Sequence, residues 1–172
     1  MNKIFAAFTS RRMFVTLLLG FASGLPFALS GATLQAWMAD QKVDLAVIGI
    51  FSLVALPYSL KFIWAPFMDR YVPPFLGRRR GWMIIAQFAL AVVIFLLGQS
   101  DPVLNPAKVA FIAVLVAFFS ASQDVVIDAY RTEVLPTEEY GIGSGVYVMA
   151  YRIAMITSGG GALVLADHMP WS

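Results

Sequence analysis

The chain has 172 residues, of which 60% are hydrophobic and 13% charged, and its mean hydropathy is +0.79. Soluble domains carry about 25% charged and about 45–50% apolar residues, so this composition excludes an ordinary water-soluble domain and a disordered chain. Cysteine is absent and His168 is the single histidine, which excludes disulfides, thiol catalysis and a metal site built from several histidines or cysteines. The net charge of +2 is small and the arginines flank apolar stretches, so the sequence does not indicate binding of nucleic acid.

Five stretches are long and apolar enough to cross a bilayer as helices. A spanning helix needs about 20 mainly apolar residues, and we predict spans over residues 13–35, 45–65, 82–100, 108–128 and 142–166. Barrel strands are excluded because these stretches are too long and too uniformly apolar. Pro26 and Pro57 are expected to kink the first and second spans. The sequence therefore predicts an all-α membrane protein with five transmembrane helices.

Basic residues are distributed unequally between the two sides of these helices. One side has only Lys42 and Lys108. The other has eight basic residues, namely Lys3, Arg11, Arg12, Arg70, Arg78, Arg79, Arg80 and Arg131. The positive-inside rule therefore predicts a cytoplasmic N-terminus. An arginine pair before an apolar stretch also fits an export signal, but this stretch exceeds the about 7–15 residues of the apolar region of a signal peptide and four spans follow it. We interpret the pair as a cytoplasmic anchor.

The fourth predicted span carries a polar stripe at its cytoplasmic end. Ser120, Asp124 and Asp128 recur every four residues and Arg131 follows three residues later, so all four share one face of the helix. We expect Asp128 and Arg131 to form an ion pair near the interface. Asp124 lies one turn deeper, beside Gln123, and two carboxylates four residues apart repel each other. Asp124 therefore needs a cation, a hydrogen-bond donor or a proton.

The fifth predicted span offers groups that could meet this need. Arg152 is expected near the middle of the bilayer, where an ionised side chain costs about 2.5–3.5 kcal/mol and normally faces a polar cavity. It could hold a carboxylate of a ligand, or it could neutralise Asp124 as a structural ion pair. Tyr147 and Tyr151 follow each other by one turn and can hydrogen-bond a polar solute. Together with Gln123, these residues are predicted to line a path for substrate or protons.

Other unusual residues of the spans are interpreted as structural. Lys61 lies one turn from the inner end of the second span, so its long side chain can reach the interface. Gly20 and Gly24 form a G-x-x-x-G pair in the first span, and Gly141 and Gly145 form one in the fifth. Small residues at this spacing allow two helices to approach closely, so both pairs are predicted to be packing faces.

The segment between the second and third spans carries a recognisable motif. Residues 65–70 read APFMDR and residues 77–80 read GRRR. This resembles the Gly-x-x-x-Asp-Arg-x-Gly-Arg-Arg loop of the major facilitator superfamily, with alanine in place of the first glycine and an insertion over residues 72–76. The resemblance implies a cytoplasmic gating loop in which the aspartate pairs with arginine and caps a neighbouring helix. That role falls to Asp69, with partners among Arg70, Arg78, Arg79 and Arg80.

Four further segments narrow the resemblance. They read GFASGLP at residues 20–26, LQAW at 34–37, KFIWAP at 61–66 and SQDVVIDAYR at 122–131. Together they resemble the AmpG-type muropeptide permeases. The resemblance implies that residues 1–172 form an incomplete N-terminal half, five of six helices, whose partner is a missing C-terminal half. It also implies proton-coupled import of anhydromuropeptides across the bacterial inner membrane, without a cofactor, for peptidoglycan recycling and β-lactamase induction.

Three alternatives stay open beside this hypothesis. The first is a related carrier for another large solute, such as acetyl-CoA or a siderophore. The second is a truncated chain with no transport activity of its own. The third is a membrane-embedded enzyme, because Asp124-x-x-x-Asp128 resembles the end of the metal-binding motif of CDP-alcohol phosphotransferases. The upstream acidic residues of that motif are missing, so neither an enzyme nor a metal site is expected.

Overall fold

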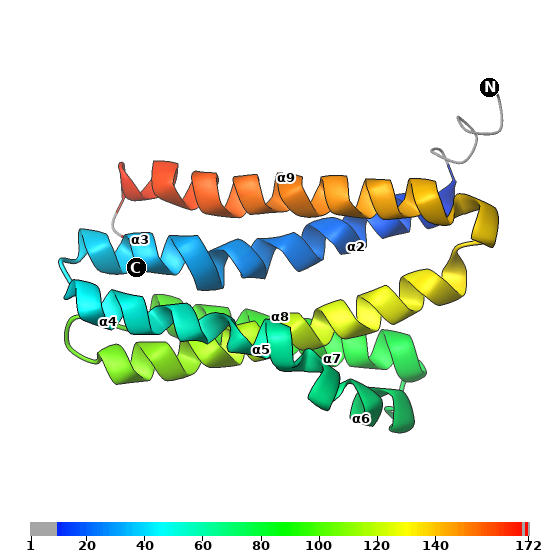
Figure 1. Cartoon of the computed structure of the whole chain (residues 1–172), viewed down its shortest axis with the longest axis horizontal. Helices are drawn as coiled ribbons and strands as arrows, with labels where there is room; N and C mark the ends of the chain where they lie inside the picture. The colour runs from blue at the N-terminus through cyan, green and yellow to red at the C-terminus, as the bar shows by residue number, and fades with distance from the viewer. Residues whose placement is uncertain (1–9, 170, 172) are drawn as a thin grey trace.

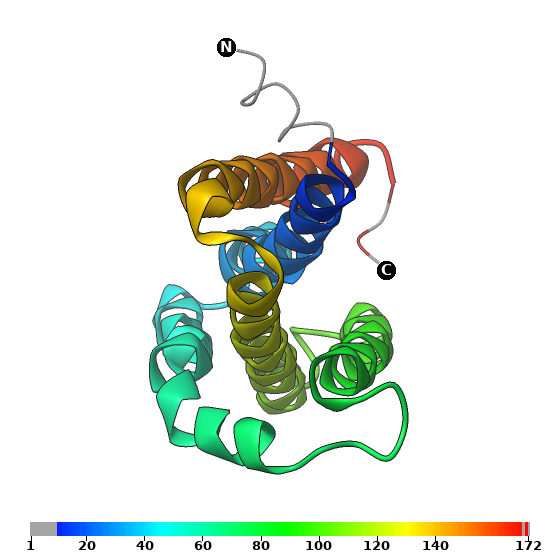
Figure 2. The same cartoon turned by 90° about the vertical axis from the view of Figure 1, so that its right-hand side faces the viewer.

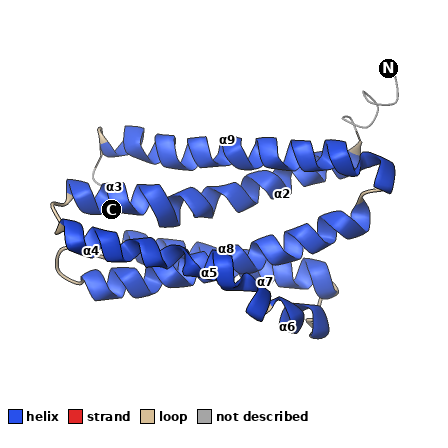
Figure 3. Cartoon of the chain, in the orientation of Figure 1, coloured by secondary structure: helices blue, strands red, loops and turns tan. Residues whose placement is uncertain are grey.

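The computed structural model describes residues 10–169 and 171, and within them every regular element is a helix (Figure 3). The elements are α2 (Arg11–Ala28), the π-helical η1 (Leu29–Thr33), α3 (Leu34–Asp40), α4 (Leu45–Ile50), η2 (Phe51–Ala55), α5 (Leu56–Leu60), η3 (Lys61–Ile63), α6 (Ala65–Arg70), α7 (Arg78–Gly98), α8 (Pro106–Val134), η4 (Thr137–Glu139) and α9 (Tyr140–Ala166). Figure 1 shows α2, α7 and α9 beginning at the same end of the bundle, where α8 ends.

Five helical stretches are long and apolar enough to cross a membrane, which confirms the fold class expected from the sequence. They are Arg11–Asp40, Leu45–Ile63, Arg78–Gly98, Pro106–Val134 and Thr137–Ala166. Several of them extend beyond the predicted spans, most clearly the fourth, which was expected to end at residue 128. Hydropathy measures the part of a helix that lies in lipid, and a helix can continue into the polar region as long as its backbone stays hydrogen-bonded.

The first stretch bends where the sequence predicted a kink. Pro26 has no N–H to donate to the preceding turn, and the helix passes into a π-helical segment three residues later. Gly31 in that segment leaves the helical region, with φ −105° and ψ −106°. The Ser30 hydroxyl donates to the Pro26 backbone carbonyl at 3.0 Å, which joins the π-helical segment to the last turn of α2.

The second stretch is divided into short pieces. It passes from α4 through η2 and α5 to η3, and α6 follows it; Pro57 and Pro66 lie in the first turns of α5 and α6. Asp44 caps its start by accepting a hydrogen bond from the Ala46 N–H at 2.8 Å. Figure 2 shows these pieces at the edge of the bundle, where few neighbours enforce a regular helix.

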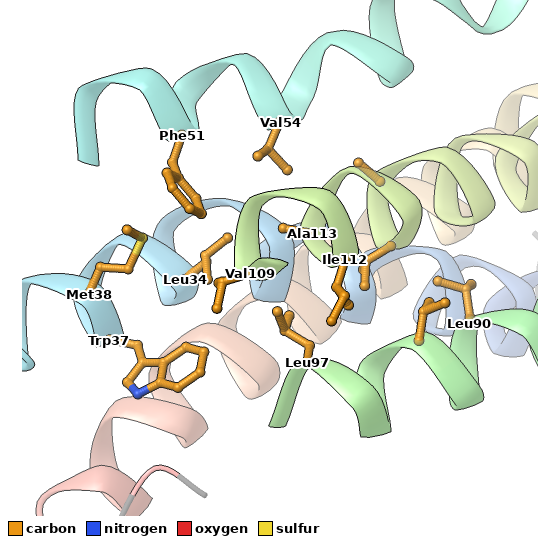
Figure 4. Packing of buried hydrophobic residues seen from close by; sticks show 13 residues of the cluster. Leu34, Trp37, Met38, Phe51, Val54, Leu90, Leu97, Val109, Ile112 and Ala113 are labelled. Atoms are coloured by element: carbon orange, nitrogen blue, oxygen red, sulfur yellow. The ribbon is translucent and has the colours of Figure 1, made fainter. Parts of the chain in front are cut away.

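Helix α8 lies at the centre and contacts α2, α5 and α7 (Figure 2). The first half of α8 joins the main apolar cluster, in which α3, η2, α7 and α8 meet (Figure 4). The buried members of this cluster are Leu34, Trp37, Met38, Phe51, Val54, Leu90, Val93, Leu97, Val109, Ile112, Ala113, Val116 and Ala117. Two of the α8 residues in this cluster, Ala113 and Ala117, are small and let the neighbouring helices approach α8 closely. This cluster holds α8 in place and fixes the position of the polar residues further along the same helix.

Helices α2 and α9 pack at very short range through glycine. A Cβ added at Gly20 would lie 2.5 Å from the Tyr147 carbonyl oxygen, and one at Gly24 would overlap the Tyr151 carbonyl oxygen. The first predicted glycine pair is therefore a packing face. The second prediction was wrong, because a Cβ at Gly141 or Gly145 would meet no described atom within 4 Å. A spacing of four identifies one face of a helix, but it does not say that the face meets a neighbour.

Candidate functional site

Polar side chains from four helices meet in the interior of the bundle. Ser23 comes from α2, Tyr58 from α5, Ser120 and Asp124 from α8, and Tyr147 from α9. Ser23, Ser120, Asp124 and Tyr147 are 1%, 0%, 8% and 9% exposed. We call these five residues the polar cluster. Charged and polar groups at this depth are costly in a membrane helix, which makes the polar cluster the candidate site.

Several atoms of the polar cluster lack a hydrogen-bond partner among the described residues. They are Ser23 Oγ, Ser120 Oγ and Asp124 Oδ1, together with Oε1 of the adjacent Gln123. A buried polar atom without a partner costs about 1–3 kcal/mol, and most such atoms in native structures are satisfied by protein or water. Four of them in one region therefore indicate a place for water or a polar ligand.

The glycine contact between α2 and α9 positions Ser23 in this region. Ser23 lies between Gly20 and Gly24 on α2, so the short helix separation brings its hydroxyl beside both Tyr147 and Asp124. The contact with Asp124 does not meet the geometry of a hydrogen bond. The two glycines thus place a hydroxyl and a carboxyl side by side without committing either one to the other.

Aromatic rings form a wall beside the polar cluster. The centroid of Phe27 lies 4.9 Å from that of Tyr58 and 6.0 Å from that of Tyr151, and Tyr147 lies 6.2 Å from Tyr151. The Tyr58 hydroxyl is 3.4 Å from the hydroxyl of Ser30, next to the bend in the first helix. Rings with polar edges can contact a large solute through both apolar and hydrogen-bonding groups.

Arg152 does not join the polar cluster and forms no ion pair with Asp124 among the described residues, so of the two roles that the sequence left open, the structural ion pair is not formed. Arg152 is exposed and lies on a face of α9 with the exposed residues Val148, Met149 and Ile156. With 3.6 residues per turn it is rotated by about 140° from Tyr147, which faces the interior. Lys61 of η3 lies near enough to act electrostatically on Asp124, although the two side chains form no ion pair among the described residues. The sequence had favoured a purely structural role for that lysine.

An ion pair borders the polar cluster on its side toward the end of α8. Arg131 Nη2 lies 3.2 Å from Asp128 Oδ1, one turn apart on the same helix. The Arg131 guanidinium also lies 4.5 Å from the centroid of the Tyr147 ring, a cation–π contact. Asp128 and Arg131 are therefore engaged with protein partners, in contrast to Asp124.

A charged network closes this end of the bundle. Arg79 of α7 pairs with Asp69 of α6, and its Nη2 lies 2.7 Å from Oε1 of Glu133 on α8. Arg78 adds a longer contact to Glu133 at 3.6 Å and donates to the Asp69 backbone carbonyl at 3.3 Å. We call Asp69, Arg78, Arg79 and Glu133 the end network. Among the described residues, Arg70 and Arg80 take part in no ion pair.

The sequence reasoning missed several of these contributors. Glu133 was overlooked because the predicted span ended at residue 128, although a helix extended by two turns would have included it. Three uncharged contributors were also missed, because only ionisable residues in the spans were considered costly in lipid. They are Ser23, Ser30 and Tyr58. A signal for Ser23 existed, because it lies within the glycine pair that predicted a close helix contact.

Comparisons with known proteins agree with this architecture. The model of the family described as Acetyl-coenzyme A transporter 1 matches residues 12–168. An Escherichia coli K12 protein named anhydromuropeptide permease is 52% identical over 160 residues, which cover 93% of this chain and 33% of that protein. A Haemophilus influenzae protein, named only as uncharacterized, is 44% identical over 170 residues, covering 99% of this chain and 40% of that protein. The chain thus spans well under half the length of these curated relatives.

Proposed function

This chain belongs to the transporter family described as acetyl-coenzyme A transporter 1, and on that basis we propose that it forms part of a secondary transporter importing anhydromuropeptides. The cargo follows the name of the Escherichia coli relative. The observation that carries the proposal is the polar cluster, in which buried polar atoms on α2 and α8 have no partner in the described chain. Import would run from the periplasm to the cytoplasm across the bacterial inner membrane, with the N-terminus cytoplasmic, and would supply peptidoglycan recycling and β-lactamase induction.

In this proposal the polar cluster is one wall of the substrate path. A muropeptide carries hydroxyl, amide and carboxylate groups, which match the free hydroxyls of Ser23 and Ser120 and the nearby tyrosine rings. Gln123 and Tyr151 extend the same wall. Secondary transporters place substrate near the middle of the bilayer between two halves that rock against each other. We therefore assign the opposite wall to a C-terminal half, and we place the exposed Arg152 toward it.

We further propose that Asp124 carries the coupled proton. A buried carboxyl group without a committed partner can be neutral in one state and ionised in another, when Lys61 or the cargo compensates its charge. Asp128 is less suited to this role, because Arg131 already compensates it. Proton coupling would thus depend on the one aspartate of this helix that lacks an arginine partner.

The end network supplies the gate in this account. Asp69 and Glu133 hold Arg79 from two sides, so the ends of α6, α7 and α8 are tied together in the present conformation. Side chains of this network are 15–54% exposed, so water can replace its ion pairs at modest cost. Breaking the contacts of Arg79 would release α8, and with it the polar cluster, during the transport cycle.

The test is uptake of radiolabelled anhydromuropeptide by cells that lack their own uptake and express the gene encoding this chain. We expect uptake that unlabelled anhydromuropeptide abolishes and that a protonophore stops. A second candidate cargo, acetyl-CoA, is suggested by the description of the family model, so unlabelled acetyl-CoA is the competing arm. Inhibition by acetyl-CoA at lower concentration than by anhydromuropeptide would contradict the proposed cargo. Uptake that persists with protonophore would contradict the coupling.

A further inference from the structure

A cavity lies away from the polar cluster, at the end of the bundle that Figure 2 faces. It has a volume of about 570 Å³ and lies between α2, α7 and α8. Three arginines line it, Arg11 and Arg12 from the start of α2 and Arg80 from the first turn of α7. Val15 and Leu19, one and two turns further along α2, continue the cavity as an apolar surface. We call it the arginine cavity.

The three arginines of the cavity have no acidic partner in the part of the chain that the structure describes. No acidic residue lines the cavity, and its three arginines form no ion pair among the described residues. The two closest acidic residues along α8 are engaged elsewhere, Asp128 with Arg131 and Glu133 with Arg78 and Arg79. Residues 1–9, which precede the cavity in the sequence, contain no aspartate or glutamate. Three clustered guanidinium groups repel one another, so the arrangement favours a bound anion.

The apolar surface indicates which kind of anion fits. Val15, Leu19 and, on α7, Met83 line the same cavity as the arginines, which is the arrangement that a charged headgroup followed by an acyl chain requires. A small soluble anion would gain nothing from this surface. The cavity also lies at the end of spanning helices, where headgroups are found, and basic pockets between membrane helices are known to hold anionic headgroups. Guanidinium groups bind phosphate through two parallel hydrogen bonds, which suits a phosphodiester.

We propose that the arginine cavity binds an anionic phospholipid, with the phosphate between Arg11, Arg12 and Arg80 and an acyl chain along Leu19 and Met83. Such a lipid bridges the start of α2 to the start of α7. Arg80 directly follows Arg79 of the end network, so the lipid would sit beside the gate without belonging to it. The proposal does not depend on the identity of the cargo.

The test counts lipids bound to the purified protein by native mass spectrometry. The protein is released from detergent after incubation with equimolar phosphatidylglycerol and phosphatidylcholine, and the ratio of the two bound lipids is measured. We expect phosphatidylglycerol to dominate, and each change Arg12→Gln or Arg80→Gln to lower the ratio about fivefold, as the loss of one basic residue near a lipid headgroup predicts. Lys108→Gln is the matched control, because it removes one exposed positive charge at the other end of the bundle. It should leave the ratio unchanged.

Two further experiments distinguish a lipid bound in the cavity from lipids attracted to the positive charge of this surface in general. Met83→Trp fills the cavity without changing any charge, so it should lower the ratio as strongly as an arginine substitution. Inorganic phosphate added in excess should not displace the lipid, because it cannot use the apolar surface. Four results would overturn the proposal. The ratio of phosphatidylglycerol to phosphatidylcholine could fall equally in Lys108→Gln, or stay unchanged in the double variant Arg12→Gln/Arg80→Gln. It could also stay unchanged in Met83→Trp, or inorganic phosphate could displace the lipid.

Discussion

The polar cluster and the end network both contain acidic residues on or beside α8, but they differ in whether the carboxylates of these residues have a partner. In the end network Asp69 and Glu133 share Arg79, and nearby Asp128 has Arg131. In the polar cluster, one turn further into the bundle, Asp124 keeps an oxygen without a partner although it is 8% exposed. Of these four acidic residues, the three nearer to water are paired and the buried one is not. Since stability alone would favour the reverse, the difference points to use of Asp124 by something other than the fold.

The largest effect is expected from separating the helices that create the polar cluster. Gly24→Leu places a side chain against the backbone of Tyr151, which cannot move without shifting α9. Overpacking typically costs about 1–3 kcal/mol and more when backbone must move, so we expect a loss of at least about 3 kcal/mol in the free energy of unfolding. Thermal unfolding in detergent, followed by tryptophan fluorescence, measures it.

Gly145→Leu is the matched control for this prediction. A Cβ at Gly145 would meet no described atom within 4 Å, so the same substitution should leave the unfolding temperature nearly unchanged. Equal destabilisation by the two variants would mean that the loss does not come from the close contact of α2 with α9, and helix propensity could not explain it because leucine is a better helix former than glycine.

The next prediction compares the same substitution, aspartate to asparagine, in the two regions, where it should change the free energy of unfolding in opposite directions. Asp124→Asn removes a buried charge that no arginine compensates, so at alkaline pH it should raise the free energy of unfolding by about 1–3 kcal/mol. Asp69→Asn removes one partner of Arg79 and should lower it. Chemical denaturation of both variants in the same detergent gives the comparison. A loss of stability in Asp124→Asn would show that its carboxyl group is satisfied and would remove the contrast.

A smaller effect is expected at the centre of the end network. Arg79→Gln breaks the contacts to Asp69 and Glu133 together, and Arg79 is the less exposed partner at 15%, so we expect a loss of about 1–2 kcal/mol that shrinks at high salt. Arg70→Gln removes an exposed arginine from the same end and is the control, with a change within about 0.5 kcal/mol. Similar losses in both variants would argue for a general charge effect at this end.

The smallest effect is expected for Arg152→Gln. The side chain is exposed and forms no ion pair among the described residues, so its removal should change the free energy of unfolding by less than about 0.5 kcal/mol. The same denaturation experiment measures it. A loss of more than about 2 kcal/mol would revive an ion pair with a buried carboxylate, since breaking a buried pair is strongly destabilising.

Much of the fold could be predicted because lipid leaves a chain few choices. A backbone in hydrocarbon must satisfy its own hydrogen bonds, so five long apolar stretches become five helices. The position of Asp124 within a polar stripe also followed from spacing alone. What could not be predicted was the direction each stripe faces. Arg152 lies one residue after Tyr151, yet the rotation of α9 against α2 turns it outward, and that rotation is set by glycine contacts between residues more than 100 positions apart.

The central claim, that the polar cluster receives the cargo, is tested most directly by uptake of radiolabelled anhydromuropeptide in cells expressing the Asp124→Asn variant. The loss of one hydrogen bond to a charged group is worth about 1.5–3 kcal/mol, so uptake should fall about tenfold or more at equal amounts of protein in the membrane. Asp167→Asn makes the same chemical change at a residue whose side chain is 84% exposed, and it should transport at the unchanged rate. Uptake by Asp124→Asn equal to that of Asp167→Asn would contradict the account.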